Sequence, residues 1–198
     1  MKINKNSTVS LAFISLFSAL TAIGAFIKIP LPYVPFTLQV LFVFLAGSLL
    51  GSKRGMQSQL VYVGIGLAGL PVFTQGGGIG YFLQPTFGYL IGFIAGAFVV
   101  GWIIERIANP KTYQFIFANL AGLLVIYLIG VPYLYLALNI WMGIQSSWAH
   151  VWMVGFVYSI FGDIVISVIA GILVTRLYKV FHKNRNGQPI KVQEERTI

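Results

Sequence analysis

The chain alternates between long apolar stretches and short segments rich in charge, glycine or proline. A transmembrane helix needs about 20 consecutive, mostly apolar residues. The pattern predicts an all-α integral membrane protein, folded as a single bundle of six transmembrane helices. We place these helices at 8–27, 37–51, 56–73, 87–104, 113–137 and 151–175.

Two features leave neighbouring helix counts open. The second stretch is short, and we interpret "GSKRG" at 51–55 as a glycine-bracketed basic turn before the third helix. Pro132 lies inside the fifth stretch, where a proline removes one helix hydrogen bond. Five or seven helices are therefore alternatives to six. The first stretch resembles a signal peptide, but it lacks a small-x-small cleavage site, so we interpret it as a retained helix.

The composition supports a membrane protein. Hydrophobic residues make up 58% of the chain and charged residues only 9%, whereas soluble domains carry about 25% charged residues. The absence of cysteine excludes disulfides, thiolate catalysis and Cys-ligated metals. The net charge of +9 does not indicate nucleic-acid binding, because the basic residues cluster at the ends of the predicted helices.

The positions of the basic residues test the count of six helices. An even count places both termini on one side, and that side then carries all of the 13 lysines and arginines except Lys28. Cytoplasmic loops carry an excess of Lys and Arg. We therefore expect both termini to be cytoplasmic. Residues 1–178 are expected to form the membrane domain, and residues 179–198 a polar cytoplasmic tail.

The loops expected on the outer side have a distinctive composition. Residues 27–36 hold three prolines, residues 70–88 are rich in glycine and aromatics, and residues 139–152 carry three tryptophans. Within the second loop, "QGGGIG" at 75–80 lacks the spacing of a dinucleotide-binding motif. We interpret it as a flexible turn, which is also compatible with a gating loop.

One carboxylate, Asp163, stands in the middle of the last apolar stretch. No other charged residue occurs between His150 and Arg176. An aspartate at the centre of a membrane helix costs about 2.5–3.5 kcal/mol, so it usually faces a cavity or a partner. Asp163 is thus a candidate ligand acceptor or proton site. The alternative is a structural acceptor satisfied by a neighbouring hydroxyl or a water.

Neutral polar residues concentrate toward the predicted outer side. Such groups near apolar walls can orient a ligand, although each one can also join helices by hydrogen bonding. The candidates are Thr37, Gln39, Gln75, Gln84, Thr86, Tyr89, Asn119 and Tyr127.

Several classes of function are excluded or weakened by what the sequence lacks. There is no G-x-x-x-x-G-K-[ST] motif, so the chain is not expected to hydrolyse ATP. His150 and His182 fall on opposite sides of the predicted membrane and cannot share a metal. No Ser–His pair, H-E-x-x-H motif or aspartate dyad is present. We expect neither an enzyme nor a metal site.

Small residues recur at a spacing of four along the first predicted helix. They pair Ser15 with Ala19, Ser18 with Ala22, and Thr21 with Ala25. Faces of this kind let another helix approach closely. The partner helix can belong to the same bundle or to a separate membrane subunit, and the spacing alone favours neither.

Four segments carry a resemblance to a known family. "VPFTLQVLFVFLAGSLLGSKRG" (34–55), "GLAGLPVFTQGGGIGYFLQPTFGYLIGF" (66–93), "GVPYL" (130–134) and "GDIV" (162–165) resemble BioY, the biotin-specific substrate-binding subunit of energy-coupling factor (ECF) transporters. The similarity runs from about residue 10 to residue 175. It implies a six-helix bundle that captures biotin from outside. The implied partners are a transmembrane coupling subunit and two ABC-type ATPases.

The resemblance also implies roles for particular residues. Asp163 would accept hydrogen bonds from the ureido N–H groups of biotin, and Gln or Asn side chains would serve its ureido carbonyl. Aromatic side chains would enclose the bicycle, and Lys28 would attract the carboxylate. Ser15, Ala19 and Ala22 on the first helix would dock on the coupling subunit. The aromatic candidates are Phe36, Tyr81 and Tyr89.

This chain departs from the family pattern at two positions. Ile166 stands where the family has a lysine, and Phe87 where it often has glycine. Biotin is expected as the substrate, and no cofactor is expected. The alternative function is a stand-alone secondary transporter coupled to protons through Asp163. The small size of the chain and the lack of a visible repeat count against that alternative.

Overall fold

The computed structural model describes residues 7–181, and helices make up most of them. Two π-helical turns, η2 (Ala137–Trp141) and η3 (Met153–Val157), continue α5 and join α6 to α7. The helices are α1 (Ser7–Phe26), α2 (Gln39–Leu50), α3 (Ser52–Leu67), α4 (Phe87–Ile104), α5 (Thr112–Leu136), α6 (Trp148–Trp152) and α7 (Tyr158–Phe181).

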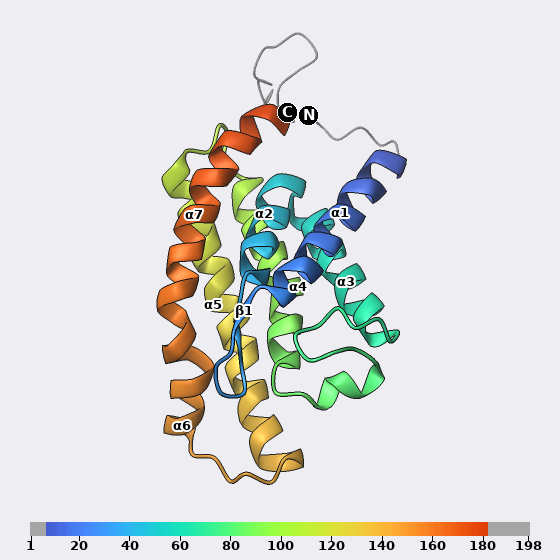
Figure 1. Cartoon of the computed structure of the whole chain (residues 1–198). Coiled ribbons are helices and arrows are strands. Elements are labelled where there is room, and N and C mark those ends of the chain that lie inside the picture. The colour runs from blue at the N-terminus through green and yellow to red at the C-terminus, as the bar shows by residue number, and fades with distance from the viewer. Residues whose placement is uncertain (1–6, 182–198) are drawn as a thin grey trace, which may run out of the picture.

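Four helical runs in the described part of the chain are long and apolar enough to cross a membrane. They are Thr8–Phe26, Phe87–Ile104, Thr112–Trp141 and Trp148–Tyr178. The other two, α2 and α3, are shorter, so the prediction of six spanning helices stays a prediction for them. The start of α1 and the end of α7 lie at the same end of the molecule (Figure 1).

The predicted basic turn at 51–55 is wrong. Only Gly51 separates α2 from α3, and Lys53 and Arg54 lie in the first turn of α3. Gly51 has a φ of 83°, in the left-handed region that favours glycine. Glu105 satisfies the start of α3, because its carboxylate accepts hydrogen bonds from the backbone N and the Oγ of Ser52 at 2.9 and 2.7 Å.

The helix around Pro132 does not break. Pro132 lies inside α5, which continues to Leu136 before the π-helical turn η2. Proline is tolerated in membrane helices because neighbouring groups and local adjustments satisfy the freed backbone groups. The run from Thr112 to Trp141 is consequently one of the two longest in the molecule, together with the run Trp148–Tyr178.

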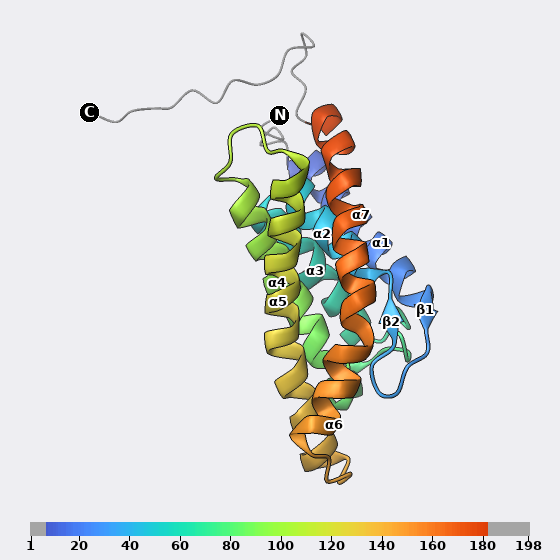
Figure 2. The ribbon, with the colours of Figure 1, turned by 90° about the vertical axis from the view of Figure 1, so that its left-hand side faces the viewer.

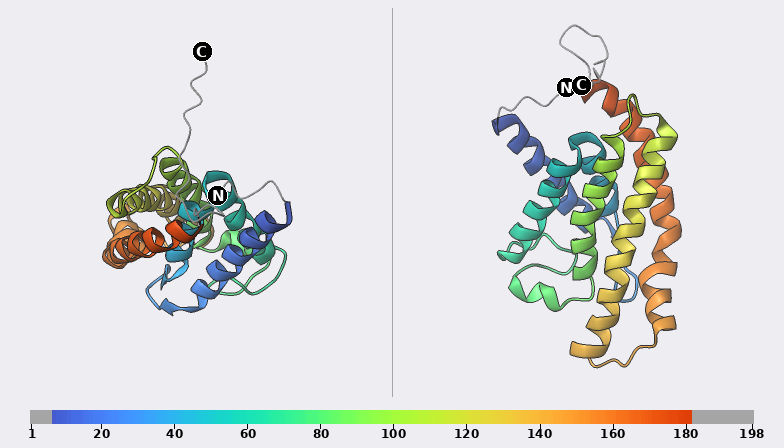
Figure 3. Two further views of the ribbon diagram at one scale, coloured as in Figure 1. Left: turned by 90° about the horizontal axis from the view of Figure 1, so that it is seen from above. Right: turned by 180° about the vertical axis from the view of Figure 1, so that it is seen from behind.

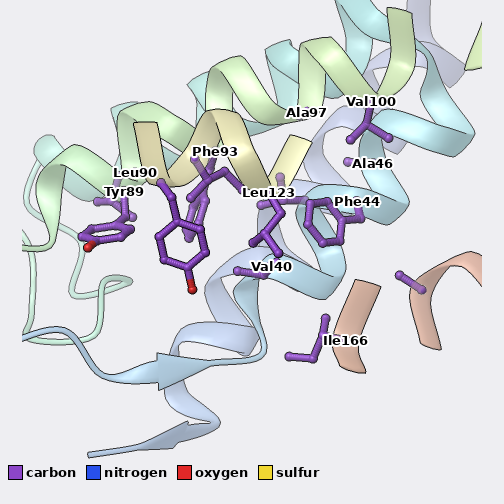
Figure 4. Close-up of a cluster of buried hydrophobic side chains, with 14 of the residues drawn as sticks. Val40, Phe44, Ala46, Tyr89, Leu90, Phe93, Ala97, Val100, Leu123 and Ile166 are labelled. Carbon is purple, nitrogen blue, oxygen red and sulfur yellow. The ribbon is translucent and has the colours of Figure 1, made fainter. Parts of the chain in front are cut away.

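The core lies where α2 and α7 meet the packed pair α4 and α5 (Figures 1 and 4). Gly92 lets α4 approach α5 closely, since a Cβ at this position would lie 2.9 Å from the Cα of Ile126. Phe44, Leu123 and Val100 belong to this core and are labelled among the buried side chains in Figure 4. Seen from above, α1 crosses the remaining side of the bundle, where it packs against α2 and α3 (Figure 3).

Two irregular segments lie toward the end of the molecule away from the C-terminal turn of α7 (Figures 1 and 2). The first is an antiparallel hairpin of β1 (Lys28–Ile29) and β2 (Phe36–Thr37), which pairs Lys28 with Thr37. The second is the loop 68–86 between α3 and α4, which contains the 3-10 turn η1 (Ile79–Leu83). We call this second segment the α3–α4 loop.

Candidate functional site

A pocket opens beside these two segments. It holds about 540 Å³ of space, a volume that includes open solvent at its mouth. The hairpin, the α3–α4 loop and helices α2, α4, α5 and α7 all contribute side chains to its wall. The lining residues are Val34, Pro35, Phe36, Thr37, Gln39, Val40, Thr74, Tyr81, Thr86, Tyr89, Leu90, Phe93, Ile126, Tyr127, Gly155, Ser159 and Asp163.

Asp163 places a carboxylate in this otherwise mostly apolar wall. The residue is 6% exposed, and the hydroxyl of Tyr127 on α5 donates a hydrogen bond to its Oδ2. One helical turn further along α7, the Oγ of Ser167 donates to the backbone carbonyl of Asp163 at 2.7 Å. An ionised carboxylate accepts about four hydrogen bonds. Asp163 therefore keeps acceptor capacity for a ligand.

Aromatic rings form two of the walls. Tyr89 on α4 is buried, and its hydroxyl donates to the backbone carbonyl of Gly155 at 2.7 Å. Phe36 of the hairpin lies against α7 at Gly162, where a Cβ would come within 2.5 Å of the ring. The ring of Tyr127 meets that of Tyr89 edge-on, with centroids 6.2 Å apart. These rings give this part of the pocket an aromatic wall.

A chain of three hydroxyls joins the α3–α4 loop to the start of α4. The Oγ1 of Thr74 lies 3.1 Å from the hydroxyl of Tyr81, which lies 3.0 Å from the Oγ1 of Thr86. All three residues line the pocket. Because each hydroxyl can donate and accept, this wall can adapt to either kind of ligand group.

A second polar cluster lies at the start of α2. The Oγ1 of Thr37 donates to the Oε1 of Gln39 at 3.1 Å, and the Nε2 of Gln39 donates to the hydroxyl of Tyr62 at 2.7 Å. Thr37 and Gln39 line the pocket, whereas Tyr62 on α3 lies outside the lining. Gln39 is therefore held on both sides by other side chains.

Ser159 is a pocket residue that the sequence reasoning missed. Its Oγ is buried and has no hydrogen-bond partner in the part of the chain described. It precedes Asp163 by four residues on α7, so both side chains lie on one face of that helix. This spacing was the available signal. Thr74 was also missed, together with the apolar lining residues other than Phe36.

Four predicted site residues are not part of the pocket lining. Gln75 is exposed and Gln84 half-buried on the α3–α4 loop. Asn119 lies within α5, where its Nδ2 donates to the backbone carbonyl of Ser167 at 3.0 Å. The Nζ of Lys28 donates to the backbone carbonyl of Thr74. Lys28 therefore holds a lining residue without being one.

Ile166, which stands where the family has a lysine, is a buried residue. Ile166 is 6% exposed and packs in the core, where Figure 4 shows it below Val40 and Phe44. It does not line the pocket, and the lining contains no lysine or arginine. The pocket wall in the described residues thus carries a carboxylate but no cationic side chain.

The small residues of α1 divide between two faces. Ser18, Thr21 and Ala25 are buried, which matches packing within the bundle. Ser15 and Ala19 are exposed, and Ala22 is half-buried. The face that carries Ser15 and Ala19 is left uncovered by the described residues.

The described residues contain no group of three His, Cys, Asp or Glu side chains that could hold a metal ion. His182, one of the two histidines in the sequence, lies outside the described residues. The apolar helices are those of a multi-pass membrane protein, and the pocket at one end is its candidate site.

Comparison with known proteins supplies the family. The BioY family profile matches residues 1–183, and the chain belongs to this family. A probable biotin transporter BioY from Lysinibacillus sphaericus is 58% identical over 193 residues, covering 98% of both chains. The biotin transporter BioY from Thermotoga maritima is 41% identical, covering 83% of this chain and 93% of its own. These relatives are transporters, not enzymes.

A solved structure agrees with this assignment. The crystal structure of the S-component for biotin from an ECF-type ABC transporter superposes with a TM-score of 0.77 at 27% identity. The match covers 89% of this chain and 94% of that one. The expected resemblance to the biotin-specific subunit of ECF transporters is confirmed.

Proposed function

We propose that this protein is the high-affinity biotin-binding subunit of an ECF transporter, which captures biotin from outside the cell. The observation that carries the proposal is the placement of the Asp163 carboxylate in a pocket walled by Phe36, Tyr89 and Tyr127. Biotin combines an apolar thioether ring with a fused ureido ring that carries two N–H donors. Aromatic walls and a buried acceptor match those two properties.

The roles of the lining residues follow from this match. Asp163 accepts from the ureido N–H groups, in charge-assisted bonds that contribute about 1.5–3 kcal/mol. Phe36, Tyr81 and Tyr89 enclose the bicycle. Biotin is the transported substrate, and no cofactor takes part. The remaining polar lining residues that we assign to the site are Thr37, Gln39, Thr86, Tyr127, Thr74 and Ser159.

The biotin carboxylate lies at the mouth of the pocket in this proposal. The lining that the described residues provide has no cationic side chain, and Ile166 stands where the family has a lysine. Lys28 is our candidate, because its ammonium group bonds the backbone carbonyl of the lining residue Thr74. At this position the positive charge of Lys28 attracts the anionic tail of biotin, with or without direct contact between the two groups.

We further propose six membrane-embedded helices with both termini in the cytoplasm. The common end of α1 and α7 supports an even number of crossings (Figure 1). Residues 1–178 form the membrane domain, and residues 179–198 the cytoplasmic tail. The pocket then opens on the outer side, beneath the hairpin and the α3–α4 loop.

The proposed partners are a transmembrane coupling subunit and two ABC-type ATPases. Ser15 and Ala19, with Ala22 at the edge, form a small-residue face that a partner helix can approach closely. Replacing both Ser15 and Ala19 by leucine should leave biotin binding intact and abolish co-purification with the coupling subunit. Val168→Phe enlarges an exposed side chain on α7 and serves as the control.

Titration of the detergent-solubilised protein with biotin, followed by calorimetry, tests the proposal. Saturable binding with a one-to-one stoichiometry supports it, and the absence of heat from a folded sample contradicts it. Uptake assays then separate the two modes of transport. The subunit model requires the ATPases for turnover, whereas proton-coupled transport through Asp163 would give pH-driven uptake by the chain alone.

A further inference from the structure

A buried hydrogen-bond chain connects the pocket wall to the α3–α4 loop. It runs from Thr37 through Gln39 and Tyr62 to the backbone carbonyl of Val72. The exposed fractions of the three side chains are 6%, 3% and 1%. Thr37 and Gln39 line the pocket, while Tyr62 reaches it only through Gln39. Water does not compete readily for bonds that are this deeply buried.

The chain has a fixed direction. The carbonyl of Val72 can only accept, so the single proton of the Tyr62 hydroxyl must go to it, across 3.2 Å. The hydroxyl oxygen of Tyr62 must then accept from its other neighbour, which is Gln39 at 2.7 Å. A glutamine donates only through its amide nitrogen. The Nε2 of Gln39 therefore faces Tyr62.

This direction determines what the pocket wall offers a ligand. With Nε2 toward Tyr62, the Oε1 of Gln39 faces Thr37 and takes the proton of its hydroxyl across 3.1 Å. Thr37 has no second proton, so its hydroxyl can only accept from a ligand. If the amide were reversed, Thr37 would accept from Gln39 and turn its own proton toward the pocket. The wall would then offer a donor where it now offers an acceptor.

We propose that Tyr62 is a positioning residue that fixes the amide orientation of Gln39 and so makes the Thr37–Gln39 wall an acceptor for ligand N–H groups. The identity of the ligand rests on the proposed function. Biotin carries two ureido N–H groups, and this wall offers them an acceptor in addition to the Asp163 carboxylate. In this way the backbone carbonyl of Val72, in the α3–α4 loop, determines the amide orientation of Gln39 on α2.

The test compares Tyr62→Phe with wild type by calorimetric titration with biotin. Loss of the hydroxyl leaves Gln39 free to reverse, and we expect the Kd to rise by about tenfold or more. Tyr133→Phe is the matched control, since the Tyr133 hydroxyl also donates to a carbonyl of the same loop, that of Phe82, but Tyr133 does not line the pocket. The control should stay within about twofold of wild type.

A double variant separates positioning from a general effect on the loop. If Tyr62 acts through Gln39, then Tyr62→Phe should change the Kd by less than about twofold in a Gln39→Ala background. Fully additive effects of the two substitutions would overturn the proposal. Equal losses in Tyr62→Phe and Tyr133→Phe would overturn it as well, because anchoring of the loop would then explain both.

A second variant keeps the test decisive if Tyr62→Phe fails to fold. Tyr62→4-aminophenylalanine retains an N–H donor for the Val72 carbonyl but is a poor acceptor for the Gln39 amide. We expect biotin binding to be lost as in Tyr62→Phe, and an affinity within about twofold of wild type would contradict the role of Tyr62. Failure of folded wild-type protein to bind biotin would instead overturn the proposed function itself.

Discussion

The hydroxyl of Tyr127 on α5 donates a hydrogen bond to the Oδ2 of Asp163 on α7. This bond joins two helices at the wall of the pocket and holds the carboxylate in one orientation. It uses only one of the two carboxylate oxygens. The same contact therefore stabilises a buried acid and leaves it able to receive a ligand.

Asp163→Asn should weaken biotin binding by about 10-fold to 150-fold, which corresponds to the loss of about 1.5–3 kcal/mol of charge-assisted hydrogen bonding. The amide also turns donors toward the N–H groups of the ligand. Tyr127→Phe should cost less, because the carboxylate remains and only its orientation relaxes. Calorimetric titration of both variants checks this ranking, and a larger loss in Tyr127→Phe would count against a direct role for Asp163.

Ser159→Ala should reduce biotin affinity several-fold while leaving the melting temperature unchanged. The Ser159 hydroxyl has no hydrogen-bond partner in the described residues, so its removal breaks no bond within the apoprotein. Ser167→Ala is the matched control on the same helix, since its hydroxyl bonds the Asp163 backbone and lies outside the lining. Unchanged affinity in Ser159→Ala would remove this residue from the binding site.

Lys28→Met separates two roles for the one basic residue expected on the outer side. If Lys28 attracts the carboxylate of biotin, the variant should lose affinity for biotin but not for biotin methyl ester. If Lys28 mainly fastens Thr74, both ligands should lose affinity equally, with faster dissociation. Because the ammonium group stays charged when it bonds the loop carbonyl, we expect the first pattern. Equal losses for the two ligands would show that Lys28 only fastens Thr74.

Glu105→Ala should destabilise the protein by about 1–2 kcal/mol, because the start of α3 loses the acceptor for the Ser52 N–H and hydroxyl. Glu105→Gln keeps one acceptor oxygen and should cost less. Thermal unfolding in detergent measures both, and biotin affinity of the folded fraction should not change. Equal stability of wild type and Glu105→Ala would show that the cap contributes nothing.

Hydrophobic patterning predicted the long helices well, because about 20 apolar residues in succession leave few alternatives. The predicted span 87–104 coincides with α4. Patterning failed at Gly51, where a basic "GSKRG" segment resembled a turn. The sequence does not display the acceptor that allows α3 to begin there, since Glu105 comes from the end of another helix.

Only part of the candidate site could be predicted from the sequence. Asp163 stood out because a charge inside an apolar helix needs a partner, and it does line the pocket. Gln75 and Gln84 seemed equivalent to Gln39 in sequence, but loop side chains have no periodicity that predicts their direction. Nothing in the sequence indicated the role that we propose for Tyr62. That role depends on the backbone carbonyl of Val72, and every residue has such a carbonyl.

Four hydrogen bonds hold the α3–α4 loop to the rest of the protein by its main chain. Tyr62, Lys28, Tyr133 and Trp141 each donate to a backbone carbonyl, and the acceptors are Val72, Thr74, Phe82 and Leu83. Substituting a side chain at those four acceptor positions leaves its carbonyl in place. The side chain of Thr74, which faces the pocket, can therefore be exchanged to redesign ligand preference without detaching the segment that covers it.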